Sequence, residues 1–141
     1  MKTIYTLAIL LGISLFFTSC GSDDEPYIVF RDSNGNAINA PVITVPLNSE
    51  RDLYIDIGYE EAKGEHNMIH YERQINDGQV IDLTFTGTLD ILTVGVHNNL
   101  LIEKAKIYLD FNENRVSRGS HVTVIIRDNG SLRRTLVFEV E

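Results

Sequence analysis

The chain has 141 residues, 43% of them hydrophobic, and a formal net charge of −8 at neutral pH. This length suits one domain with a single core, and the acidic balance argues against electrostatic binding of nucleic acid or of anionic lipid surfaces. The only cysteine is Cys20, which excludes an intramolecular disulfide.

The first residues have the layout of a secretory signal peptide, with Lys2, an apolar run over residues 4–17, and small residues before Cys20. The run is too short, and too soon followed by charge, to be a good transmembrane helix. Thr18-Ser19-Cys20 resembles the lipobox of bacterial lipoproteins. That resemblance implies cleavage before Cys20 and attachment of palmitate-type acyl chains to it, an anchor of two or three chains being stable where one is not. The alternative is an ordinary secretory signal whose cysteine merely falls near the cut.

An acidic run follows the cysteine, with Asp23, Asp24 and Glu25 in succession. It resembles the export signal of surface lipoproteins in the Bacteroidota, which implies display on the outer face of the outer membrane. The alternative, a solvated tether extended by like charges, is compatible with that role. We therefore expect a signal peptide over residues 1–19, a lipidated tether over 20–26 and one domain over 27–141.

Alternation of apolar and polar residues predicts strands along the domain, and no window has a convincing helical period. Clear runs cover residues 53–59, 81–89, 105–111, 122–126 and 136–140. Turn residues that tolerate positive φ separate them at 33–36, 76–78 and 128–130. A glycine within an apolar strand, Gly95, predicts a bulge or a close backbone approach.

These features predict an all-β domain, an antiparallel β-sandwich of immunoglobulin-like (Ig-like) type with about 7–9 strands. The stretch from Gly119 to Val140 also resembles the closing hairpin of Ig-like and PKD-like modules of bacterial surface proteins. Since the cysteine pair and tryptophan of antibody domains are absent, an up-and-down or jelly-roll arrangement stays open.

Two histidines are weak candidates for a metal site, because His66 and His70 would share one face of a helix. The residues after Asn67 alternate like a strand instead, which places His66 in a loop and His70 beside Glu72. We therefore expect no zinc site and no other cofactor.

Two loops have oxygen-bearing side chains at alternate positions, Asp32 to Asn36 and Asp110 to Asn114. Neither has the glycine and the bidentate glutamate that an EF-hand loop needs, so Asx turns account for both better. A calcium ion between loops at one end of the sandwich stays open.

No nucleophile-base pair or pocket carboxylate motif indicates an enzyme. Tyr54 and Tyr108 fall on the outward side of their strands among charged residues, as in surfaces that stack sugars or recognise proteins. Either tyrosine could instead simply cover a neighbouring strand. The sequence thus predicts a non-catalytic binding or accessory module with a glycan or protein ligand. The alternatives are an inhibitor or immunity-type lipoprotein that masks a basic protein and, less favoured, a metal-dependent hydrolase.

Overall fold

The computed structural model describes residues 25–61 and 67–141 and consists there of strands, turns and loops. The strands are β1 (Tyr27–Arg31), β2 (Val42–Val45), β3 (Glu50–Tyr59), β4 (His70–Ile75), β5 (Ile81–Asp82), β6 (Leu89–His97), β7 (Leu100–Asp110), β8 (His121–Arg127) and β9 (Arg133–Val140). The all-β prediction is therefore confirmed for the part of the chain that is described.

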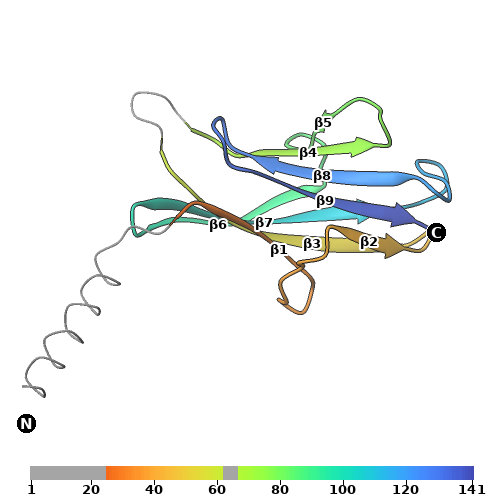
Figure 1. Ribbon diagram of the computed structural model, residues 1–141, viewed down its shortest axis with the longest axis horizontal. Coiled ribbons are helices and arrows are strands. Elements are labelled where there is room, and N and C mark those ends of the chain that lie inside the picture. The colour runs from red at the N-terminus through yellow and green to blue at the C-terminus, as the bar shows by residue number, and fades with distance from the viewer. Residues whose placement is uncertain (1–24, 62–66) are drawn as a thin grey trace, which may run out of the picture.

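Two sheets pack face to face, as Figure 1 shows. Sheet A has the order β1-β3-β7-β6, and sheet B has the order β2-β9-β8-β4-β5. All neighbouring strands are antiparallel except β2, which runs parallel to β9. The chain crosses from sheet A to sheet B between β1 and β2. Because the two sheets pack on each other, the described residues form a two-layered β-sandwich.

The alternation read from the sequence determines which side chains enter the core. Leu53, Ile55 and Ile57 of β3 are fully buried, and their cross-strand partners on β7 include Ile107 and Ala105, which are also buried. Directly paired residues share a face of a sheet, so the odd-numbered positions of both strands point inward there. Burial of this apolar surface is the main force that holds the two sheets together.

The β8–β9 hairpin contains the predicted strands and turn. Val122 pairs with Phe138 and Val124 with Leu136, and all four side chains are buried. At the tip, the Asp128 carboxylate accepts hydrogen bonds from backbone N–H groups on the far side of the turn. The predicted turn at residues 128–130 is therefore confirmed.

The strand predicted over residues 81–89 is wrong for most of its length. Only residues Ile81 and Asp82 form a strand, β5, which pairs with β4. The residues after it cross from sheet B to β6 in sheet A. Asp82 Oδ1 accepts from the Thr84 N–H, and the Thr86 N–H donates to the Leu83 carbonyl. These local bonds turn the chain, which buries Leu83 and leaves Phe85 95% exposed.

The bulge predicted at Gly95 is displaced within the same strand. Gly95 pairs regularly with Ile102, and a Cβ at this glycine would meet no atom within 4 Å. The register shift lies between Ile91 and Thr93, where Leu92 is the extra residue. Gly58 on β3 is the glycine with a close approach, because a Cβ there would lie 2.5 Å from the Tyr27 ring.

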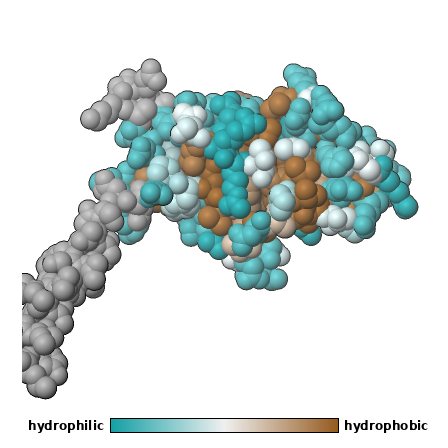
Figure 2. All heavy atoms as spheres, in the orientation of Figure 1, coloured by the Kyte–Doolittle hydropathy of each residue, from teal (hydrophilic) through white to brown (hydrophobic). Residues whose placement is uncertain are grey.

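Arginines close the margins of the core. The Arg134 guanidinium lies 5.5 Å from the centre of the Phe30 ring and donates to the Ile28 carbonyl, which links sheet B to sheet A. Arg51 lies over Phe138 in a similar way. Figure 2 shows apolar residues in the middle of the visible face, with hydrophilic residues around them. The charged guanidinium groups of both arginines thus lie over aromatic rings at the edge of the core, where cation–π attraction adds to the contact.

Candidate functional site

The outer face of sheet A carries both tyrosines that the sequence singles out. Tyr54 on β3 pairs with Lys106 of β7, and Tyr108 of β7 pairs with Asp52. Both tyrosines lie on the side opposite the buried residues of the same strands. The neighbouring positions are acidic on β3 and basic on β7, so this face is an aromatic surface with charges of both signs.

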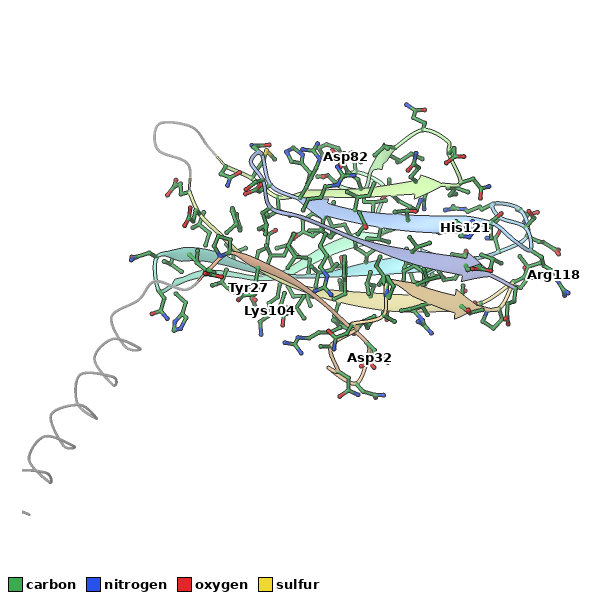
Figure 3. All side chains as sticks on the ribbon, in the orientation of Figure 1. Tyr27, Asp32, Asp82, Lys104, Arg118 and His121 are labelled. Carbon is green, nitrogen blue, oxygen red and sulfur yellow. The ribbon has the colours of Figure 1, made fainter. Side chains whose placement is uncertain are left out.

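Tyr54 lines a surface hollow of about 330 Å³. The residues around it come from β1, the loop after β1, β3, β6 and β7, namely Arg31, Asp32, Ser33, Gly35, Tyr54, Asp56, Leu92, Lys104 and Ala105. Figure 3 shows Asp32 and Lys104 on the same side of the molecule, below sheet A. The hollow combines an aromatic ring, an aliphatic side chain, two cations and carboxylates.

An ion pair holds one wall of this hollow. Arg31 Nε lies 2.6 Å from Asp56 Oδ2, and Arg31 Nη1 donates to the Gly35 carbonyl at 3.1 Å. These bonds tie the end of β1 to β3 and to the 32–36 loop. Because both sheet and loop hold Arg31, its guanidinium is in place before any ligand arrives.

The 32–36 loop is an Asx turn. Asp32 Oδ1 accepts from the backbone N–H groups of Asn34 and Asn36, both at 2.9 Å, and Gly35 has a φ of 83°. Asn112 Oδ1 accepts from the Asn114 N–H in the same manner. The side-chain oxygens of Asp32 and Asn112, two of those that suggested calcium, thus accept hydrogen bonds from the backbone of their own loops.

Tyr108 lies outside the hollow and is 37% exposed. A hydrogen bond with Glu50 raises the pKa of its phenol. The structure therefore separates the two tyrosines, since Tyr54 lines this hollow and Tyr108 does not.

The predicted histidine pair is only half described. His66 lies outside the described residues, and His70 is on β4, on the outer side of sheet B. His70 Nε2 is 2.5 Å from Asn129 Oδ1, while Glu72 accepts from Arg127 Nε at 2.8 Å. Over residues 25–61 and 67–141, no group of three or more His, Cys, Asp or Glu side chains could hold a metal ion.

A second, larger hollow of about 990 Å³ lies at the end of the sandwich where β1 begins. Its lining includes the carboxylates of Glu25, Glu60, Glu61 and Asp128. Asp128 already accepts bonds from its own turn. The remaining carboxylates give this end of the molecule a negative surface.

One carboxylate points toward the interior. Glu103 of β7 pairs with Ile57 on the core-facing side, close to the hydroxyl groups of Tyr59 and Tyr71. Burial raises the pKa of the Glu103 carboxyl, and burial together with this carboxylate raises the pKa values of both phenols. Sequence reasoning missed Glu103, although its odd position on β7 places it on the inward side.

The hollow around Tyr54 was likewise not predicted beyond Tyr54 itself. Arg31 and Leu92 reach it only through the strand order β1-β3-β7-β6 and the bulge in β6. Alternation along β7 predicts that Lys104 faces outward, but its position near Tyr54 depends on the register between β3 and β7.

No protein-family model matches the sequence, and a search of curated proteins finds no similar one. None of the described segments is a helix of the length and hydrophobicity needed to span a membrane. Cys20, Asp23 and Asp24 lie outside the described residues, and Glu25 is exposed just before β1.

Proposed function

We propose that this protein is a non-catalytic binding or accessory module, anchored by lipid at Cys20 in the outer membrane and displayed on the outer face. The observation that carries the binding role is the hollow beside Tyr54, one wall of which is formed by the ion pair of Arg31 with Asp56. Its volume falls in the range of about 300–1,000 Å³ that is usual for small-ligand sites.

We also propose that the domain is Ig-like. Strand order supports this, because β1-β3-β7-β6 corresponds to strands A, B, E and D of an immunoglobulin sheet. In sheet B, the order β9-β8-β4 corresponds to G, F and C, and β5 takes the position of the first of the two additional strands of variable-type domains.

A glycan is the ligand class that the Tyr54 hollow fits better than a protein. The ring of Tyr54 and the aliphatic Leu92 offer apolar contact for the C–H face of a sugar. Arg31, Lys104 and Asp56 are donors and acceptors for its hydroxyl groups. A protein ligand, the other class expected from the sequence, would use Tyr54 as one anchor of a wider contact.

A glycan array with the wild-type protein and two variants tests this role. Tyr54→Ala removes the ring from the hollow, whereas Tyr108→Ala removes an exposed tyrosine from the same face and serves as the matched control. We expect Y54A to lose the glycan signal and Y108A to keep it. Binding that survives in Y54A, or no glycan binding by the wild type, contradicts a glycan site there. A photo-crosslinking amino acid at position 54 then tests for a protein ligand on intact cells, with position 108 as the control.

Protease treatment of intact cells tests surface display. We expect the wild-type protein to be cleaved and a variant with Asp23, Asp24 and Glu25 replaced by alanine to be protected. If neither is cleaved while both remain in the membrane, the outward display is wrong and the ligand belongs to the periplasm.

The alternative of an inhibitor that masks a basic protein has one observation in its favour, the acidic hollow lined by Glu25, Glu60 and Glu61. Such a complex is expected to weaken steeply with salt, because exposed charges are screened over about 8–10 Å at physiological ionic strength. Binding through the Tyr54 hollow depends less on salt. A zinc-dependent hydrolase is the least supported function, and an unchanged zinc content after His66→Ala and His70→Ala together would dispose of it.

A further inference from the structure

The β6 strand is a long, open sheet edge. The edge strands of the two sheets are β1, β2, β5 and β6, and they have 5, 4, 2 and 9 residues respectively. Proteins commonly protect sheet edges by shortness, lysine, proline or a β-bulge. β1, β2 and β5 are short, while β6 is long, contains neither lysine nor proline, and has a single bulge at Leu92.

Apolar side chains on β6 remain in solvent. Ile91, Val94 and Val96 pair with Ala105, Glu103 and Leu101 of β7, so they continue the inward face of sheet A. Yet their exposed fractions are 45%, 70% and 73%. The inward row of β6 therefore extends past the core instead of lying in it, which marks an interaction surface.

The sequence of β6 is symmetric about Val94 once the bulge is taken into account. Thr93 and Gly95 flank Val94 on the outward side, and Ile91 and Val96 follow on the inward side. Asp90 and His97 come next, again on the outward side. Leu92, which lines the outer hollow, is the unpaired residue of the bulge and interrupts the register without changing the faces.

We propose that β6 pairs with β6 of a second copy of this chain, antiparallel and about a twofold axis through Val94. In this register Val94 lies opposite Val94, Ile91 opposite Val96, and Asp90 opposite His97 of the other copy. Each apolar residue thus meets an apolar one on the same face, and each carboxylate meets an imidazole. A twofold interface must be self-complementary, and a mirrored strand satisfies that condition.

The symmetry is the reason to choose a second copy over an unrelated strand. Any extended peptide can bond to the free N–H and C=O groups of an edge, so the backbone alone selects no partner. Cross-strand side-chain pairs do select, because matched pairs stabilise and like charges directly opposite destabilise. The mirrored pattern matches apolar with apolar at positions 91, 94 and 96, and a carboxylate with an imidazole at positions 90 and 97.

The rest of the fold leaves room for this contact. β1, which follows the proposed lipid tether, lies at the opposite edge of sheet A from β6. The twofold axis is perpendicular to the sheet, so the two Tyr54 hollows open on the same side of the joined sheet. The pairing does not depend on what the hollow binds, and the experiments on Tyr54 and on β6 can fail separately.

Cysteine cross-linking on intact cells tests the register. Val94→Cys puts two thiols opposite each other, where Cα atoms of paired residues are about 4.5–5.5 Å apart, within the span of a disulfide. Two equivalents of copper(II) phenanthroline accept one electron each and become copper(I), while the two thiols lose two protons and form one S–S bond. We expect V94C to run as a covalent dimer under non-reducing conditions, above the background of the wild-type protein with its single Cys20.

Val96→Cys is the matched control, with a side chain exposed to the same degree. The register separates the two copies of position 96 by four residue steps, about 13 Å along the strands, so V96C alone should give no dimer. Cells that express one chain with V96C and a second chain with Ile91→Cys should regain the covalent dimer. The pairing is refuted if V94C stays monomeric, or if V96C alone cross-links as well as V94C, since that indicates collision. Because positions 94 and 96 are largely exposed, neither substitution removes core packing.

Discussion

The buried carboxylate at the tip of the β8–β9 hairpin offers a sharp test of what stabilises this sandwich. Asp128 is 9% exposed, and its Oδ1 accepts from the N–H groups of Gly130 at 2.8 Å and Leu132 at 3.1 Å. Its Oδ2 also lies 3.4 Å from Asn67 Nδ2. Asp128→Ala removes all of these contacts and leaves backbone donors without an acceptor.

The size of the effect follows from the two backbone bonds. A hydrogen bond to a charged group contributes about 1.5–3 kcal/mol net, and the lower end applies here because Gly130 is on the surface. Two such bonds predict a loss of about 3 kcal/mol in the free energy of unfolding. This is a large part of the total free energy of unfolding, which is about 5–15 kcal/mol for native proteins.

Asp32 is the matched control. Its Oδ1 accepts two backbone bonds of 2.9 Å in an exposed Asx turn, so the number of bonds is the same and the burial differs. Water can replace the lost acceptor there, and Asp32→Ala is expected to cost under about 1 kcal/mol. Urea denaturation of the protein from residue 21 onward measures both variants, with an unchanged slope as the check that only stability has moved. Equal losses in D128A and D32A would refute the role assigned to burial.

Other substitutions test the core and its margins. Glu103→Gln should stabilise the protein at neutral pH. Folding raises the pKa of the Glu103 carboxyl above its ordinary value of 4.5, so the wild-type protein loses stability as the pH rises from 4.5 through the pKa of the folded state. Thermal melts should therefore show a higher melting temperature for the variant at neutral pH and no difference below pH 4.5. Phe138→Ala should lower the free energy of unfolding, measured by urea denaturation, by about 3–5 kcal/mol, because the ring is fully buried and its centre lies 5.5 Å from the centre of the Phe111 ring. A loss below about 1 kcal/mol would contradict that packing. Gly58→Ala should lower the melting temperature because the new Cβ meets the Tyr27 ring, and in a Tyr27→Ala background that added loss should vanish.

Features of this fold that depend on residues near in sequence were predicted correctly, and features that depend on distant segments were not. Alternation correctly assigned Leu53, Ile55 and Ile57 to the core, and the β8–β9 turn was correct, because both depend on residues near in sequence. The strand over 81–89 failed since Asp82 and Thr86 bond to nearby backbone groups and turn the chain despite the alternation. The bulge was assigned to Gly95 for its residue type, whereas the register with β7 places it at Leu92.

The candidate site shows the same division. Parity alone put Tyr54 and Tyr108 on an outward face, and nothing in the sequence distinguished one from the other. Only the strand order brings Arg31 of β1 and Leu92 of β6 to Tyr54, across sequence separations that no short window contains.

By itself, the sequence determined the class of fold, the inward and outward sides of most strands, and the motif from which lipid attachment at Cys20 is proposed. The tertiary structure decided which strands are neighbours, where the register shifts, and which apolar residues remain exposed on β6. The physical reason is that side-chain direction in a strand depends on the local backbone. Strand neighbours depend on the burial free energy of the whole core, to which distant segments contribute together.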